Sequence, residues 1–455
     1  MTTSQFVEDC RTLISIDSSP SQGNRAVVSW VAKAAQQAGL TVVLQEERSG
    51  EVPQANVIIR PAGGSSDEDS LMLQTHLDTA DPGPFGLWKE NHYNPFDAHI
   101  IDGKIFGVGT ANCKLDFLCK LEALKRINAR GATWAAAKKP VLVGTFGAED
   151  GMTGALKLMR KNLINPRFAI IGEPSSLRVL VAGKGQARIQ IRIPFEKDEL
   201  AFRTEHNLRE STSSMSKTFS GKPAHASTPQ LGDSAIKKLF YHLAQLPEDI
   251  AIMEIDGGVD VATVPAHAFL EIDPVSGFRF SMAKKLNRLF KTVLNLELEF
   301  ASFQDQDFTP SHPTLNIGSV RTFEDSVELA VDVRIVPQVP MEIYEKWMDE
   351  IGGVCRQMSG ECHVNHFKRP YRADPNSTLV QGAQDVLAKL GRASSPKTHS
   401  STNEASLFSR AGVECISFGP GQSEGNVFTP REHVTIDDLK AAVDFYVGMI
   451  EKFCC

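Results

Sequence analysis

Apolar runs alternate with amphipathic helical segments through the first part of the chain. Residues 140–146 form a continuous apolar run, as expected for a strand covered on both faces of a sheet. Residues 24–37 carry apolar side chains at helical spacing, with Asn24 as the expected N-cap and Gly39 after the helix. Strands that alternate with helices in this way predict an α/β sheet with helices on both faces.

The pattern changes near Ala182. Residues 186–193 alternate polar and apolar side chains, which predicts an antiparallel strand with one solvated face. We expect a charged loop over residues 196–217 and another alternating strand over residues 261–272. From about Ala373 the α/β pattern returns.

The chain has 455 residues, which is too long for one ordinary hydrophobic core. We therefore predict an α/β domain made of residues 1–181 and 371–455, ending in a helix over residues 436–453. A smaller α+β domain, residues 182–370, interrupts it.

Composition narrows the class of protein. Hydrophobic residues make up 42% of the chain and charged residues 23%, as in a soluble globular protein. The net charge of −7 gives no support for a nucleic-acid partner or an anionic membrane surface. No apolar run approaches the ~20 residues of a membrane span, and the first residues lack the pattern of a signal peptide. Eight scattered cysteines without Cys-x-x-Cys predict a reduced, cytoplasmic protein.

Candidate chemistry begins where the apolar run Leu71-Met72-Leu73 leads into Thr75-His76-Leu77-Asp78-Thr79. Such a strand delivers an imidazole and a carboxylate to the rim of the sheet, where open α/β sheets bind ligands. Gly107-Val108-Gly109 then allows a tight backbone turn shortly before Asn112, at the start of an expected helix.

With Trp88, Pro95-Phe96 and Asp102-Gly103-Lys104, this stretch resembles a family of dinuclear zinc amidohydrolases and metallopeptidases. The family contains aminoacylases, acetylornithine deacetylases, succinyl-diaminopimelate desuccinylases and carboxypeptidase G-like enzymes. Its motif reads His-x-Asp, Trp, Pro-Phe, Asp-Gly-Lys and Gly-x-Gly-x-x-Asp-x-Lys. The resemblance covers nearly the whole chain and implies a zinc-peptidase-like catalytic domain, a mixed sheet with helices on both faces. An α+β lid interrupts that domain, and a homodimer through the lid is implied.

The resemblance also implies roles for individual residues. His76 matches an imidazole ligand of one zinc ion, and Asp78 matches the carboxylate that orients this imidazole. Glu173, in Gly-Glu-Pro, and Glu149 match carboxylate ligands of the two ions. Asn112 stands where the family has its metal-bridging Asp. A neutral amide cannot bridge two dications as a carboxylate does.

Two further positions depart from the family. Ala148 occupies the general-base position, and Phe428 stands where the last imidazole ligand is expected. An alignment shifted by one residue would instead make Glu149 the base and Asp150 the ligand, although the following glycines favour the unshifted one. Loss of general-base help alone typically costs ~10²–10⁴ in rate.

Other residues could substitute for the lost groups. Asp116 shares a helix face with Asn112 and could supply a carboxylate. Asp150, His399 and His433 are further candidates. Neither histidine has motif support, and a surface or loop role is the alternative for each.

Three residues are candidates for contacts with a ligand. His225 lies in a segment that resembles the lid motif whose histidine steadies the oxyanion; an exposed loop histidine is the alternative. Arg334 and the loop over residues 400–405, which contains Asn403, could hold a substrate carboxylate. A structural role for Arg334 is an equally good interpretation.

The substitutions at Asn112, Ala148 and Phe428 predict that the chain keeps the fold of the family without its catalytic activity. We expect hydrolysis to be lost or strongly reduced, with one weakly held zinc ion at most or none. A small amino-acid-like or peptide ligand, or an assembly role, would remain. The alternative is an active hydrolase of an N-acyl amino acid or small peptide that uses one metal and a rearranged base. A third possibility is a protein that acts through its lid surface as the partner of an intact homologue.

Overall fold

The computed structural model describes residues 3–62, 69–131, 139–148, 151–208 and 215–455. The chain divides into two compact units. The first unit comprises Met1–Ala182, Tyr371–Thr398 and Asn403–Cys455, and the second comprises Gly183–Pro370 and His399–Thr402. Residues 399–402, which we had assigned to the α/β domain, therefore belong to the second unit.

The first unit is built on a mixed sheet, which has nine strands in the described part of the chain. Its order is β1-β2-β6-β3-β7-β18-β8-β16, with β17 paired to β8. The central strands β6, β3, β7 and β18 are parallel, whereas β1 and β2 form an antiparallel hairpin. The strands are β1 (Leu40–Ser49), β2 (Val52–Pro61), β3 (Asp69–His76), β6 (Lys139–Thr145), β7 (Phe168–Gly172), β8 (Leu180–Gly183), β16 (Tyr371–Arg372), β17 (Lys397–His399) and β18 (Glu414–Phe418). A small sheet joins β4 (His99–Ile101), β5 (Lys104–Phe106) and β19 (His433–Thr435).

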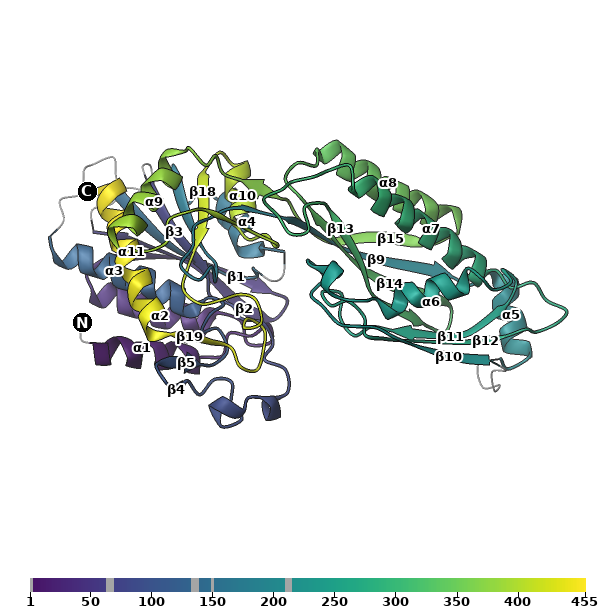
Figure 1. The fold of residues 1–455 in the computed structure, drawn as a ribbon. Coiled ribbons are helices and arrows are strands. Elements are labelled where there is room, and N and C mark those ends of the chain that lie inside the picture. Colours follow the sequence, from purple (N-terminus) through teal and green to yellow (C-terminus); the bar gives the residue numbers. More distant parts are fainter. Residues whose placement is uncertain (1–2, 63–68, 132–138, 149–150, 209–214) are drawn as a thin grey trace. The chain divides into compact units, whose positions relative to one another are not determined.

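Helices cover both faces of the large sheet, which confirms the predicted fold class (Figure 1). The larger apolar cluster lies under α1 (Thr3–Ser15), α2 (Arg25–Gln37), α3 (Lys114–Ala129), α9 (Thr378–Lys389) and α11 (Ile436–Cys454). A second cluster on the opposite face lies under α4 (Thr153–Arg160) and α10 (Ala405–Arg410). Because β3, β6 and β7 are buried on both faces, their sequences read as continuous apolar runs.

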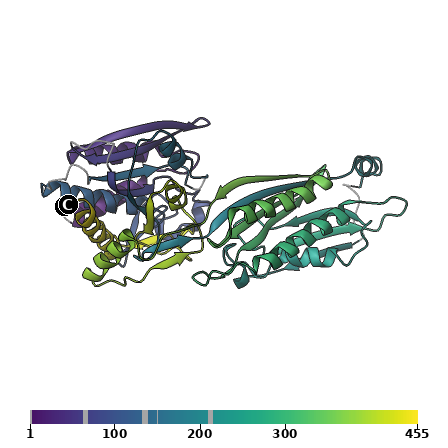
Figure 2. The same cartoon turned by 90° about the horizontal axis from the view of Figure 1, so that it is seen from above.

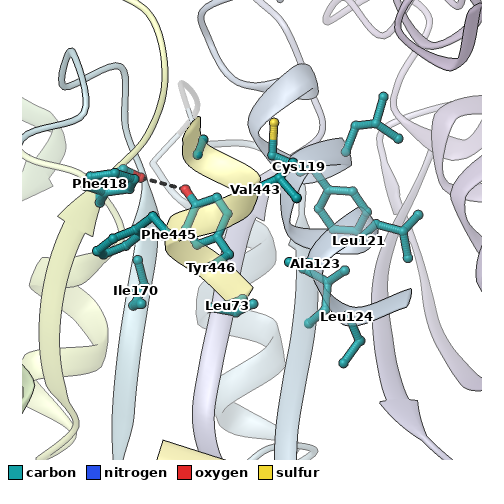
Figure 3. Packing of buried hydrophobic residues seen from close by; sticks show 14 of the residues in the cluster. Leu73, Cys119, Leu121, Ala123, Leu124, Ile170, Phe418, Val443, Phe445 and Tyr446 are labelled. Atoms are coloured by element: carbon teal, nitrogen blue, oxygen red, sulfur yellow. Dashed lines mark hydrogen bonds between the residues drawn. The ribbon is translucent and has the colours of Figure 1, made fainter. Parts of the chain in front are cut away.

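The larger cluster is anchored by aromatic packing between α11 and the sheet (Figure 3). Phe445 stacks on Phe418 at a centroid distance of 3.8 Å, and the Tyr446 hydroxyl donates to the Phe418 carbonyl at 3.2 Å. The last strand before the Gly-Pro-Gly turn is thus fixed to the last helix.

The second unit is an antiparallel sheet with the order β10-β12-β11-β13-β14-β9-β15. Helices α6, α7 and α8 pack against its strands, and Figure 2 shows α7 and α8 lying along the sheet. Its strands are β9 (Gly185–Pro194), β10 (Met215–Ser220), β11 (Ala251–Gly257), β12 (His267–Asp273), β13 (Thr314–Thr322), β14 (Ser326–Ile335) and β15 (Glu361–Lys368). Its helices are α5 (Lys197–Glu205), α6 (Ala235–Leu243), α7 (Met282–Phe300) and α8 (Met341–Gln357). This unit also contains the short 3-10 helix η3 (Pro229–Leu231), and the first unit contains η1 (Phe85–Leu87) and η2 (Lys89–Asn91).

Three local predictions were wrong or incomplete. The expected loop over 196–217 contains α5 and the start of β10, because Phe202 stacks on the Phe278 ring and stabilises a charged helix. The expected strand over 261–272 begins only at His267. The helix after Asn24 forms as predicted, but the Asn24 side chain binds the backbone of Ala55 instead of capping the helix. Within the described residues, no helix has the length and apolar character needed to cross a membrane.

Candidate functional site

His76 is the last residue of β3, so its imidazole lies at the carboxyl edge of the parallel strands. The side chain is buried, and its Nδ1 atom lies 3.0 Å from the Asp78 carbonyl oxygen and 3.5 Å from Asp78 Oδ1. Its Nε2 atom lies 3.2 Å from Asn112 Oδ1. His76 and Asp78 are therefore close to one another, and the Nε2 atom faces the amide oxygen of Asn112.

A buried carboxylate holds the turn that carries Asn112. Glu432 Oε1 accepts hydrogen bonds from the backbone N–H groups of Ala111 and Asn112, at 2.9 and 3.0 Å. Burial raises the pKa of Glu432 to about 7, although these hydrogen bonds act in the opposite direction. The Cys113 thiol donates to Asn112 Oδ1 at 3.1 Å. The amide of Asn112 is thereby fixed between the imidazole of His76 and the thiol of Cys113.

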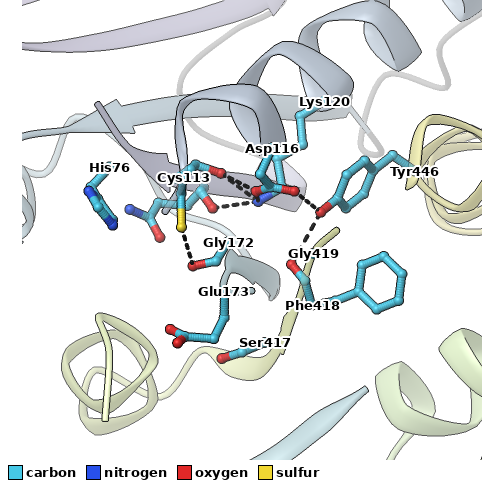
Figure 4. A network of polar contacts seen from close by, with 12 residues as sticks. His76, Cys113, Asp116, Lys120, Gly172, Glu173, Ser417, Phe418, Gly419 and Tyr446 are labelled. Carbon is cyan, nitrogen blue, oxygen red and sulfur yellow. Dashed lines mark hydrogen bonds and ion pairs between the residues drawn. The ribbon is translucent and has the colours of Figure 1, made fainter. Parts of the chain in front are cut away.

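Glu173 directly follows β7 and lies near the Cys113 thiol, which contacts the Gly172 carbonyl at 3.9 Å (Figure 4). Its Oε2 atom accepts a hydrogen bond of 2.8 Å from Asn403 Nδ2. Asn403 also donates to Ser417 Oγ at 2.9 Å. In this structure Asn403, our candidate for substrate binding, positions the Glu173 carboxylate.

The two remaining substituted positions lie on loops at the same edge. Ala148 is buried, and its N–H donates to Asp78 Oδ2 at 3.1 Å. Phe428 is 60% exposed and adopts a left-handed backbone conformation, with φ of 61°. Glu149 and Asp150 lie outside the described residues, so neither the predicted ligand nor the shifted alignment can be placed.

A small pocket adjoins Asn112. It has a volume of about 20 Å³, about enough for one water molecule, and is partly open to solvent. The residues that line it are Thr79, Ala80, Asp81, Pro82, Trp88, Val108, Gly109, Asn112, Phe428 and Glu432. The lining combines aromatic and carboxylate side chains.

Asp116, a candidate substitute for the bridging carboxylate, is engaged elsewhere (Figure 4). Its Oδ2 atom lies 2.8 Å from Lys120 Nζ and accepts from Thr75 Oγ1 at 2.7 Å, while Oδ1 accepts from the Tyr446 hydroxyl. Asp116 and Lys120 are both almost fully buried. The carboxylate therefore joins α3, β3 and α11.

The candidate histidines lie on other elements. His433 is on β19, where its ring packs on Phe106 at 5.0 Å and Nδ1 lies 2.9 Å from the Arg431 carbonyl. His399 belongs to the second unit, and its carbonyl accepts from the Lys184 backbone N–H.

The second unit holds the remaining two candidates. The His225 ring is exposed, and its Nδ1 atom lies 2.8 Å from Ser227 Oγ. Arg334 is buried on β14 and makes a two-point ion pair with Asp332 of the same strand, at 2.5 and 3.2 Å. Its Nη1 atom donates to Ser401 Oγ at 3.3 Å. Much of the hydrogen-bonding capacity of Arg334 is therefore used inside the unit.

The described residues do not form a complete metal site. Among them there is no cluster of three or more His, Cys, Asp or Glu side chains that could hold a metal ion. The Cys113 thiol lies close to His76, and burial raises its pKa to about 12. Only two of the implied ligands within the described chain, His76 and Glu173, are ionisable.

Sequence reasoning missed two groups at this edge. Cys113 follows Asn112 directly, and only its place in the motif could have identified it. Glu404 is buried and accepts from Thr145 Oγ1 at 2.7 Å and from the Gln74 amide, and burial raises its pKa. This carboxylate ties the loop of Asn403 to β3 and β6.

Comparisons with known proteins agree with this architecture. The sequence profile of peptidase family M20/M25/M40 matches residues 72–452. The chain is 24% identical over 458 residues to an acetylornithine deacetylase of Vibrio parahaemolyticus serotype O3:K6, covering 98% of this chain and 96% of that protein. It is 22% identical over 454 residues to the acetylornithine deacetylase of Aliivibrio fischeri strain MJ11, covering 97% and 95%.

Solved structures share the fold. An aminoacylhistidine dipeptidase from Vibrio alginolyticus superposes with a TM-score of 0.64 at 14% identity, covering 94% of this chain and 92% of that one. An M20 family metallo-carboxypeptidase from Sulfolobus solfataricus superposes with a TM-score of 0.62 at 16% identity, covering 98% and 99%.

Proposed function

This chain belongs to peptidase family M20/M25/M40, a family of metallopeptidases and deacylases, and we propose that it has lost or strongly reduced the hydrolysis typical of its relatives. The observation that carries the proposal is the amide of Asn112 beside His76. In this family's pattern a carboxylate bridges two zinc ions at that position. A neutral amide removes a negative charge from between dications only ~3.5–4 Å apart.

The surrounding side chains support the same conclusion. Ala148 cannot accept a proton from a nucleophilic water, and the aromatic ring of Phe428 cannot coordinate a dication. His76 contacts the amide of Asn112, and Glu173 accepts from the amide of Asn403. Each of the two implied ligands thus contacts a neutral amide side chain. We propose that the protein holds one weakly bound zinc ion at most, or none.

The partly open pocket beside Asn112 is the place that we propose for a retained binding role. Trp88 and Phe428 line it with apolar side chains, and the Asp81 carboxylate offers a polar contact. We propose a small amino-acid-like or peptide ligand, a class consistent with the names of the relatives, acetylornithine deacetylase and aminoacylhistidine dipeptidase.

Paired measurements of metal and activity test this proposal. The chain is purified without chelator, and zinc is quantified alongside hydrolysis of N-acetylornithine and of dipeptides. The Vibrio parahaemolyticus acetylornithine deacetylase is assayed in parallel as the active control. We expect kcat/KM to be lower by at least ~10²-fold, because the general base alone contributes this much. Activity equal to that of the control would overturn the proposal.

The alternative is an active amide hydrolase with one metal ion and a rearranged base. It is favoured by relatives that align over 97% of this chain and are named as deacetylases. Substantial hydrolysis that depends on a single bound zinc ion would support it.

We also propose a homodimer through the second unit, as the family resemblance implies, and a reducing, cytoplasmic location. The eight cysteines are all free thiols, which suits a reducing compartment. Co-purification with an intact relative would instead favour a role as the partner of that enzyme.

A further inference from the structure

Two cysteines of the second unit lie on either side of a tight turn. Cys355 is in the last turn of α8, and Cys362 is the second residue of β15. The Cys355 carbonyl accepts from the backbone N–H groups of Met358 and Gly360, at 2.9 and 2.8 Å, and Ser359 has a φ of 55°. The chain therefore reverses immediately after the helix and brings the strand back along it.

The reversal brings the two cysteines close together, and each thiol perturbs the pKa of the other. Cys355 is fully buried under the helix, whereas Cys362 is partly exposed. In the described chain β15 is the edge strand of its sheet and pairs only with β9. One thiol is thus open to a small reagent, and its partner is shielded behind it.

The electrostatic environment differs between the two thiols. The hydrogen bond from Cys355 lowers the pKa of Cys362, and the neighbouring Arg356 cation acts in the same direction against burial. The same hydrogen bond and burial raise the pKa of Cys355. Reactive thiols need thiolate character and access, and Cys362 is the thiol of the pair with a lowered pKa and with access to solvent. By contrast, burial raises the pKa of Cys415 to about 12.

We propose that Cys355 and Cys362 form a redox-active dithiol, with Cys362 as the attacking thiol and Cys355 as the resolving thiol. The oxidant is a peroxide. The Cys362 thiolate attacks one peroxide oxygen, the O–O bond breaks, and hydroxide leaves, which forms a sulfenic acid. The Cys355 sulfur then attacks the sulfenic sulfur, and a disulfide and water form, with the Cys355 proton leaving on the water. Two thiols lose two electrons, and the peroxide gains them.

The disulfide would covalently join the end of α8 to the edge strand β15. A link that is made and broken reversibly suits a chain whose cysteines are otherwise reduced. The proposal concerns only the second unit and stands whether or not the chain hydrolyses amides.

Peptide mapping of the full-length chain tests the proposal. The protein is treated with limiting hydrogen peroxide, free thiols are alkylated, and trypsin cleaves after Arg356. Peptides 347–356 and 357–368, which each hold one cysteine of the pair, should appear as one disulfide-linked species. The free thiol count should fall from eight to six and return with dithiothreitol.

Variants give the controls. Cys362→Ser and Cys355→Ser should each lose the linked species, and in Cys355→Ser dimedone should trap a sulfenic acid on Cys362. Cys455→Ser removes an exposed cysteine and should leave the linked species unchanged. If peroxide oxidises Cys455 while Cys355 and Cys362 stay reduced in the wild-type chain, the proposal is wrong. This test uses the wild-type chain and therefore does not depend on whether any variant folds.

Discussion

Replacing Asp116 with Asn separates a structural role from a metal-binding one. The carboxylate lies 2.8 Å from the ammonium group of Lys120, and both side chains are buried. In the variant the Lys120 charge would stay buried without its counter-ion, a change that typically costs about 3–5 kcal/mol. Because Lys120 Nζ also donates to the Gln74 carbonyl and to Thr75 Oγ1, at 2.7 Å each, we expect the lower end, about 3 kcal/mol.

The assay is urea unfolding followed by circular dichroism, with zinc content measured in the same preparations. Lys120→Met should also destabilise the chain. The free energy of unfolding lost in the double variant should be smaller than the sum of the two single losses by roughly 0.5–3 kcal/mol, as for residues in one network. Asp385→Asn is the matched control, because its ion pair with Lys452 is exposed and should contribute at most about 1 kcal/mol.

A structural role for Asp116 would be refuted if Asp116→Asn unfolded at the same urea concentration as the wild type. It would also be refuted if this variant lost bound zinc while it kept its stability. Asp116 would then be the substitute ligand left open by the sequence, and the network with Thr75 and Tyr446 would carry little energy.

Two further predictions concern the site and the second unit. Asn112→Asp combined with Ala148→Glu and Phe428→His should restore tight zinc binding, measured by elemental analysis, and failure would show that the three positions are misassigned. Burial lowers the pKa of Lys184 to about 8. The unfolded chain therefore binds more protons between pH 8 and the ordinary lysine range, and stability should rise with pH there. We expect the free energy of unfolding, taken relative to Lys184→Met, to rise by about 3 kcal/mol over this pH range, from roughly 1.36 kcal/mol per pKa unit. Urea unfolding of both proteins at several pH values measures this difference. A difference that does not change with pH would contradict the prediction.

The sequence predicted those parts of the fold that hydrophobic periodicity determines. The apolar run over 140–146 became β6, and the helix expected over 436–453 became α11. The segment 196–217 was missed because α5 has a polar sequence, and its stability depends on tertiary contacts such as the stacking of Phe202 on Phe278.

The site shows the same limit. The motif placed His76 and Asn112 together because strand ends and the following turn meet at one edge of the sheet. It could not show that Asn403 binds Glu173, or that Asp116 is engaged by Tyr446. These contacts join positions more than two hundred residues apart, and only the packing of the complete unit brings them together.

Zinc content of the wild-type chain tests the central claim most directly. The protein is purified without chelator, dialysed against zinc-free buffer and analysed for metal per chain. The Asn112 amide, with Ala148 and Phe428, predicts at most one zinc ion, which is lost on dialysis. Two zinc ions per chain that survive dialysis would contradict the account.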